Sequence, residues 1–301
     1  MKFDSYHPAI NLIYFTASIA CTVYFRHPVF LTISYISAFL YSVKLNGRKA
    51  LIFNVCLMLL VILYAGFYSY YNHFGVTVLR RNLIDNQITL EAAACGIATG
   101  AAVAAVIMIM SCVFAVFSSD KVVYLFGKIS PRLSLFLSIL LRTVPRLKKK
   151  ASGINVSQYG IGMSIKQGGI AKRCGNCVRL VSILITWLLE SFIESSLSMK
   201  SRGYSLKGRT SFSIYRFDNR DRAFAVVLFL CMTLTAMAIM LDQALIYYDP
   251  EIVMNRITPM SVLFYAAYAV FMLLPLILQT VSKIRFKSVA RIDTKAFIIV
   301  K

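Results

Sequence analysis

Long stretches with almost no charged side chain constrain this chain more than any other feature. Residues 50–72 (ALIFNVCLMLLVILYAGFYSYYN) contain no charge, and residues 91–117 contain only Glu91. A helix of about 20 apolar residues crosses the roughly 30 Å hydrocarbon core of a bilayer. Further apolar stretches lie at 9–43, 223–247 and 260–282. The pattern predicts an all-α membrane protein.

The composition supports the same class. Of the 301 residues, 58% are hydrophobic and 15% are charged, and the mean hydropathy is +0.70. Soluble domains average about 45–50% apolar and about 25% charged residues. The composition therefore excludes an ordinary cytosolic enzyme, a disordered chain and a secreted disulfide scaffold. Most of the seven cysteines fall in apolar stretches, where they behave as small hydrophobic residues.

The first apolar stretch, 9–43, is interrupted by Arg26-His27-Pro28. Because proline and two polar groups interrupt a helix, we expect two short helices joined by a tight turn. With the four other apolar stretches, this gives six predicted spans.

The charge distribution predicts the topology. The chain has 33 Lys and Arg against 12 Asp and Glu, a net charge of +21. The basic residues lie between and beside apolar stretches, which fits the positive-inside rule better than a nucleic-acid interface. The loop 44–49 and the tail from 283 are basic, whereas the loops 73–91 and 243–259 are nearly balanced. We therefore expect a multi-pass cell-membrane protein with both termini cytoplasmic and no nucleic-acid partner.

The middle of the chain is strongly basic. Residues 142–222 contain sixteen Lys and Arg, opposed by only four acidic residues, so we expect this segment to be cytoplasmic. Polar residues recur every four positions within it, which would place them in one stripe along a helix. They are Ser182, Thr186, Glu190, Glu194 and Ser198. Two carboxylates one turn apart favour an amphipathic helix along the cytoplasmic side, and a seventh span is the alternative.

Residues 143–165 are predicted to form a partner helix, with glycines at 160, 162, 168 and 169 allowing a break before the next helix. The chain is therefore expected to have four regions. Residues 1–142 form a membrane region with about four spans and a short membrane-associated segment, 143–222 two long cytoplasmic helices, 223–282 a two-span hairpin, and 283–301 a basic cytoplasmic tail.

The sharpest local feature is the string SMKSRGYSLKGRTSF at 198–212. Gly203 is well suited to end a helix in the left-handed conformation. Arg202 would then project from the last turn, where a cation is favoured by the helix dipole. A helix end with solvated basic residues is the plainer interpretation.

This string resembles the signature of the transmembrane T component of energy-coupling factor transporters, the EcfT/CbiQ family. Ser201-Arg202-Gly203 matches the small-Arg-Gly tripeptide at the tip of a cytoplasmic coupling helix, and Arg209-Thr210 matches the Arg-Thr pair that follows it. The stretches NHFGVTVLRRNLIDNQITLEA and FGKISPRLSLFLSILLRTVPRLKKK fit the family as well.

The resemblance implies a non-catalytic coupling subunit of an ATP-driven importer. Its partners would be two ABC-type ATPase subunits, which bind ATP and Mg, and a small membrane-embedded substrate-binding subunit, all within the lipid bilayer or at its surface. The chain itself would bind no cofactor. The cargo would be a vitamin or related micronutrient, or cobalt or nickel in the metal-type systems, and the FGVT and ITLEA stretches favour the vitamin type.

One motif departs from the family pattern. A second small-Arg-Gly tripeptide is expected in the first coupling helix, after an Ala-Gln pair. Here the matching stretch is Ser157-Gln158-Tyr159-Gly160-Ile161-Gly162, with Ile161 in the place of the arginine. We therefore assign no arginine role to this first coupling site, formed by Gln158, Gly160, Ile161 and Gly162. Its contact is either apolar or weaker.

Small residues recur every four positions in the stretch 91–117, at Ala92, Gly96, Gly100 and Ala104. Such rows let helices approach closely in a membrane. The row therefore packs either against other helices of this chain or against the substrate-binding subunit.

Other functions have weaker support. No G-x-x-x-x-G-K-[ST] phosphate loop is present. The Cys174-Gly-Asn-Cys177 pair has no further zinc ligands near it in the sequence, so we predict no metal site. A self-contained secondary transporter, an intramembrane enzyme using Asp218 and Asp221, and a paralogue that has lost coupling through Ile161 remain as alternatives.

Overall fold

The computed structural model describes residues 3–72, 74–81, 87–204, 206, 215, 217–255 and 257–299. The chain forms two compact units. One comprises Met1–Ser118 together with Tyr215–Lys301, and the other comprises Ser119–Ile214. Both units are built from helices, and in the described residues strands occur only as two short hairpins.

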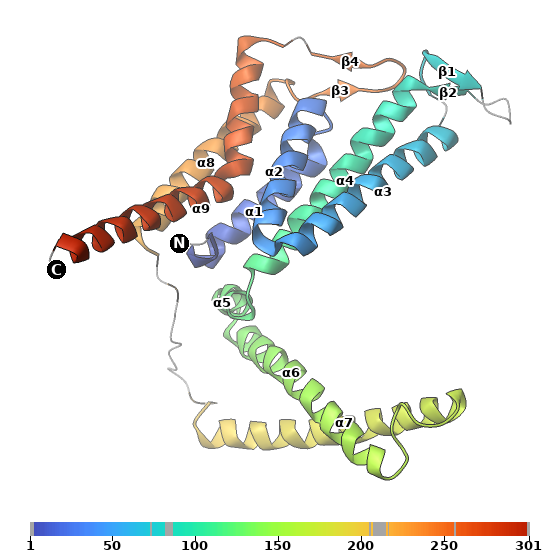
Figure 1. Ribbon diagram of the computed structural model, residues 1–301, viewed down its shortest axis with the longest axis vertical. Helices are drawn as coiled ribbons and strands as arrows, with labels where there is room; N and C mark the ends of the chain where they lie inside the picture. Colours follow the sequence, from blue (N-terminus) through green and yellow to red (C-terminus); the bar gives the residue numbers. More distant parts are fainter. Residues whose placement is uncertain are drawn as a thin grey trace. The chain divides into compact units, whose positions relative to one another are not determined.

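In the described part of the first unit, six α-helices pack as a bundle (Figure 1). They are α1 (Pro8–Tyr24), α2 (Pro28–Asn46), α3 (Arg48–Tyr71), α4 (Leu90–Val116), α8 (Asn219–Met240) and α9 (Pro259–Ile299). Helix α2 lies between α4 and α9, α3 packs along α4, and α8 packs on α9. A short 3-10 turn, η1 (Phe3–Ser5), precedes the bundle. The hairpins are β1 (Val78–Arg81) with β2 (Gln87–Thr89), and β3 (Ile246–Tyr247) with β4 (Val253–Met254).

Helices α1 and α2 begin in the same way. In each, a histidine is the N-cap and a proline takes the first helical position, where its missing N–H costs nothing. The Nδ1 atoms of His7 and His27 accept the backbone N–H groups of Ala9 and Val29, both at 3.3 Å. The predicted break at Arg26-His27-Pro28 is therefore confirmed, and the histidine itself caps the second helix.

The His27 cap makes the stability of this turn depend on pH. His27 is only 3% exposed, and burial lowers the pKa of its imidazole. Because the pKa is lower in the folded state, stability is fully present above the unfolded value of about 6.5 and is lost as the pH falls through the folded pKa. We expect His27→Asn, which retains a capping side chain, to reduce the loss of thermal stability between pH 7 and pH 5. An unchanged pH profile in this variant would contradict the assignment.

Hydroxyl groups join the helices inside the bundle. Ser34 of α2 and the Tyr268 hydroxyl of α9 lie 2.6 Å apart, and Tyr14 of α1 donates to the Met272 carbonyl of α9 at 3.0 Å. Met272 lies one turn before Pro275, which is inside α9. Pro275 has no N–H to donate to the carbonyl of Phe271, four residues earlier. The Tyr14 hydroxyl bonds the next carbonyl along the helix, that of Met272.

The small residues of α4 allow α3 to approach it closely. A Cβ atom placed on Gly96 would lie 3.2 Å from the Ala65 backbone, and one on Gly100 would lie 3.1 Å from the Tyr64 ring. Ala92 and Ala104, the other members of the row, are also buried. Gly96 and Gly100 therefore lie against α3 within this chain.

Six helices are long and apolar enough to cross a membrane by length and composition. They are α2, α3, α4, α7 (Ile170–Ser201), α8 and the segment Pro259–Ile284 of α9. The chain is thus an all-α membrane protein. The number of these candidates equals the number of predicted spans, but the set differs. Helix α7, which was predicted to lie along the cytoplasmic side with a seventh span as the alternative, meets the length and composition criteria. Helix α1 does not, because its 17 residues reach only about 25 Å.

One predicted helix end was wrong. The span expected at 223–247 runs from Asn219 to Met240, because Asp242 adopts a left-handed conformation at φ 55° and ends the helix. The span expected at 260–282 matches the candidate span Pro259–Ile284, and the helix itself continues to Ile299.

The second unit contains α5 (Ser119–Ile129), α6 (Pro131–Gly160) and α7. Helix α6 starts well before residue 143, where the first long cytoplasmic helix was expected. It runs through Pro145. Helices α6 and α7 pack together, with the Lys150 ammonium 5.4 Å from the centre of the Trp187 ring, a cation–π contact.

Candidate functional site

The Ser201-Arg202-Gly203 tripeptide forms the end of α7. Ser201 is the last helical residue, Arg202 is the C-cap, and Gly203 has a φ of 76°. The Gly203 N–H donates to the Lys200 carbonyl at 3.1 Å, and the Tyr204 N–H donates to the Met199 carbonyl at 3.2 Å. These two bonds define a Schellman motif. The predicted left-handed glycine is confirmed.

The stretch predicted to be a first coupling site has the same backbone geometry. Helix α6 ends at Gly160, Ile161 is its C-cap, and Gly162 has a φ of 76°. The Gly162 N–H donates to the Tyr159 carbonyl at 3.1 Å, and the Met163 N–H donates to the Gln158 carbonyl at 2.9 Å. The two long helices therefore end in the same motif.

Ile161 and Arg202 occupy equivalent positions in these two helix ends. Their backbone angles are φ −99°, ψ 3° and φ −82°, ψ 7°. Both side chains are exposed, Ile161 by 68%. The structure thus supports the alignment of Gly160-Ile161-Gly162 with Ser201-Arg202-Gly203. The two helix ends present different chemistry, one an aliphatic group and the other a guanidinium.

The turn between α6 and α7 is held by side-chain amides. Asn155 Oδ1 accepts the Ser164 hydroxyl at 3.0 Å and the Ile165 N–H at 3.2 Å. Asn176 Nδ2 donates to the Ser164 carbonyl at 3.0 Å. Ser164 is 2% exposed. These bonds fix the turn from both helices and so set the direction in which Ile161 projects.

The remainder of α7 is largely uncovered. Asn176 and Leu180 are the buried residues of this helix, and both lie in its first third. Glu190 and Glu194 are exposed, as are Ser182, Thr186 and Ser198 of the predicted polar stripe. The helix therefore reaches the Arg202 end with most of its surface available to other molecules.

Alanine at Gly203 should loosen the end of α7. A residue with a Cβ pays about 1–2 kcal/mol for the left-handed conformation, and the added Cβ would lie 3.1 Å from Leu206. We expect faster hydrogen exchange at 199–204 in Gly203→Ala. The matched control is Gly153→Ala in α6, whose Cβ would meet nothing within 4 Å. That variant should instead slow local exchange, because alanine favours a helix by about 1 kcal/mol. Equal effects would contradict this account.

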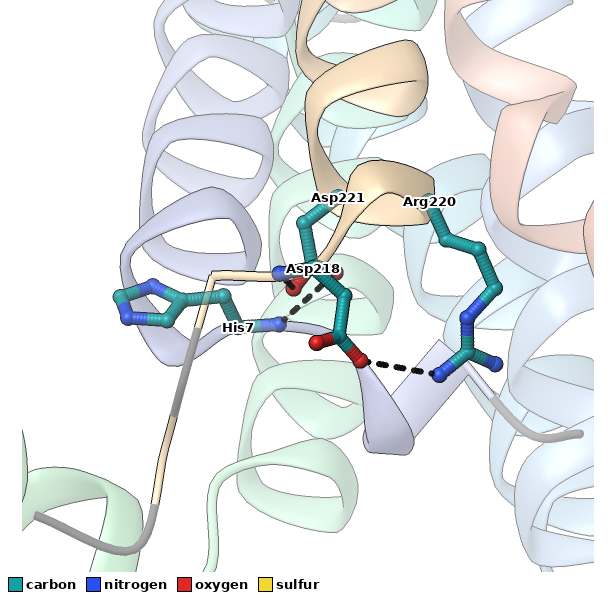
Figure 2. A network of polar contacts seen from close by, with 4 residues as sticks. All are labelled: His7, Asp218, Arg220 and Asp221. Atoms are coloured by element: carbon teal, nitrogen blue, oxygen red, sulfur yellow. Dashed lines mark hydrogen bonds and ion pairs between the residues drawn. The ribbon is translucent and has the colours of Figure 1, made fainter.

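A second polar cluster lies where the chain enters α8 (Figure 2). Asp221 is 6% exposed. One of its oxygens accepts the Asp218 N–H at 3.2 Å, and the other accepts the His7 N–H at 3.5 Å. The His7 ring also packs edge-on against Phe217, with centroids 5.2 Å apart. Asp221 therefore fastens the start of α8 to the start of α1.

The contacts in this cluster give Asp218 and Asp221 a structural role. In the sequence, these two residues were the candidates for an intramembrane enzyme. Asp218 and Asp221 cap α8, and Asp218 also forms an exposed ion pair with Arg220 at 3.3 Å. An acidic residue three positions after an N-cap is a recognisable capping pattern, so the helix start could have been read from the sequence. The contact with His7 could not, because 214 residues separate the partners.

The structure gives little information on the other residues that the sequence analysis singled out. Arg209 and Thr210 lie outside the described residues. Cys174 and Cys177 are exposed free thiols on α7. Among the residues that the structure describes, no three His, Cys, Asp or Glu side chains gather as metal ligands would.

Comparison with known proteins gives one informative similarity. No protein-family model matches the chain. Over 90 residues, however, the chain is 32% identical to the energy-coupling factor transporter transmembrane protein EcfT of Lactobacillus helveticus (strain DPC 4571). The match covers 30% of this chain and 32% of that protein. About a third of the chain is therefore similar to the membrane protein of an energy-coupling factor transporter.

Proposed function

We propose that this chain is the transmembrane coupling subunit of an energy-coupling factor importer. It would transmit ATP hydrolysis by two partner ATPases to a small substrate-binding membrane subunit, without catalysing a reaction itself. The cargo would be a vitamin or related micronutrient. The observation that carries the proposal is the exposed Arg202 at the hydrogen-bonded end of α7, in the tripeptide Ser201-Arg202-Gly203.

The physical role of such a helix end is mechanical. A helix seated in a groove of each ATPase would follow the groove when the ATPases close. A guanidinium can hold a carboxylate through two parallel hydrogen bonds, which fixes the helix end in position. The Schellman motif at Gly203 supports this role, because it stops the helix directly after Arg202.

The proposal places α6 and α7 on the cytoplasmic side. The sixteen Lys and Arg of residues 142–222 support this location. So do Glu190 and Glu194, which are exposed on α7 and would be costly within a bilayer. Both chain termini would be cytoplasmic as well.

The two helix ends would contact the ATPases differently. Arg202 would pair with a carboxylate, whereas Ile161, in the equivalent position, would fill an apolar depression. In this view Arg209 and Thr210 extend the Arg202 contact.

Gentle purification from native membranes tests the proposal. We expect two P-loop ATPase subunits and one small hydrophobic protein to co-purify with the chain, and the small protein would point to the cargo. A chain that emerges alone, under conditions in which a known complex of this type survives, would contradict the proposal and favour a stand-alone permease.

A further inference from the structure

An open apolar groove lies where α2 ends, α3 begins and α4 ends. Its volume is about 590 Å³, within the range of small-molecule sites. Its walls come mainly from Phe53 of α3 and from Ile107, Met110 and Phe114 of α4. These four side chains are between 38% and 79% exposed. In a membrane, such a surface is covered by lipid or by another protein.

One end of the groove is polar. Asn46, the last residue of α2, lines this end and donates a hydrogen bond from Nδ2 to the Ser111 hydroxyl at 3.3 Å. Gly47 then turns the chain, with a φ of 66°, and α3 begins at Arg48. The groove therefore runs from the border of the membrane region toward its interior.

Basic residues stand at the same end. Arg48 and Lys49 are the first two residues of α3, and both are exposed. Lys44, in the last turn of α2, is exposed as well, but its ammonium donates to the Leu276 carbonyl of α9 at 3.4 Å. Lys49 is one turn before Phe53 and shares its face of α3. The first turn of α3 contains no acidic residue, and among the described residues no side chain caps its N-terminus. An anionic group is stabilised near such a helix N-terminus.

We propose that this groove binds an anionic phospholipid, with an acyl chain along Phe53, Ile107 and Met110 and the phosphate beside Lys49. Charge complementarity selects this occupant. A partner helix would need an acidic group at this depth, whereas anionic headgroups are supplied by the leaflet itself. Basic pockets between membrane helices bind such headgroups. The site involves none of the residues proposed for coupling, and it would be present with or without ATPase partners.

Fluorescence quenching by brominated lipids tests the proposal on the full chain in vesicles. Trp187 is the single tryptophan, so Trp187→Phe gives a silent background into which Phe53→Trp is introduced. Vesicles of phosphatidylcholine would contain either brominated phosphatidylglycerol or brominated phosphatidylcholine. We expect the tryptophan at position 53 to prefer the anionic lipid about fivefold, the factor that one lysine near an anionic surface provides. Lys49→Ala should remove the preference.

The matched control is Ile52→Trp in the same background. Ile52 is 70% exposed and lies at nearly the same depth, but consecutive helical residues point about 100° apart. This position should show little preference. Equal quenching by the two lipids at position 53 would overturn the proposal. A tryptophan there that neither lipid quenches would also overturn it, because protein would then cover the groove.

A second measurement requires no change in the groove. Mass spectrometry of the wild-type chain after a delipidating detergent wash should detect retained phosphatidylglycerol. Lys49→Ala should lose this lipid, whereas Arg222→Ala, which removes an exposed charge at the start of α8, should retain it. Loss of the lipid in both variants, or in neither, would contradict a site at Lys49.

Discussion

Replacing Arg202 with glutamate should abolish co-purification of the ATPase subunits while leaving the chain inserted and folded. Arg202 is exposed at the end of α7, so its replacement removes no buried contact. Truncating one partner of a desolvated charge pair costs about 2–5 kcal/mol, and a reversed charge adds repulsion. The affinity should fall by a factor of roughly 30 or more, measured as ATPase recovered per membrane subunit.

Two further variants separate a specific contact from general electrostatics. Lys148→Glu reverses an exposed charge in the middle of α6 and should leave ATPase recovery close to that of the wild type. Arg202→Lys keeps the charge but loses the bidentate geometry, so it should give an intermediate result. Wild-type recovery and uptake in Arg202→Glu would exclude the role proposed for this residue.

Replacing Asp221 with alanine should produce the largest loss of stability among single changes in the α8 region. Its carboxylate accepts the His7 and Asp218 N–H groups in a buried position. An unsatisfied buried donor costs about 1–3 kcal/mol. For a unit of this size, each kcal/mol shifts the unfolding midpoint by about 2–4 °C. We therefore expect a decrease of several degrees in detergent, measured by thermal unfolding.

Arg220→Ala is the matched control for Asp221→Ala. Arg220 forms an ion pair with Asp218 in which the two side chains are 56% and 60% exposed. Such pairs contribute about 0–1 kcal/mol, so the midpoint should scarcely change. Asp221→Asn retains one acceptor and should lie between the two. If Asp221→Ala were as stable as Arg220→Ala, Asp221 would not fasten α8 to α1.

The elements that could be predicted from the sequence are those with uninterrupted apolar composition. The stretches 50–72 and 91–117 closely match α3 and α4, because a long charge-free segment has few alternatives to a helix in a membrane. The break before Pro28 and the end of α7 at Gly203 were also predictable. Each depends on a backbone preference of a single residue type, which acts locally.

Features that depend on tertiary contacts were not predictable. A helix was expected to begin at residue 143, yet α6 begins at Pro131 and continues through Pro145, because flanking turns can support a helix that lacks one hydrogen bond. The Asp221–His7 contact joins distant parts of the sequence. For the predicted first coupling site, the sequence showed that Ile161 stands where the resemblance leads one to expect an arginine. Only the backbone geometry showed that Ile161 and Arg202 occupy equivalent helix ends.

The most direct test of the coupling proposal is site-specific photo-cross-linking in native membranes. A photoreactive phenylalanine analogue at Tyr204, two residues after Arg202, preserves an aromatic side chain at an exposed position. The control carries the analogue at Val144, which is 64% exposed on α6. The account predicts that position 204, and not position 144, yields an adduct to a protein whose peptides include a P-loop ATPase motif. An adduct only to lipid at position 204, or none, would contradict it.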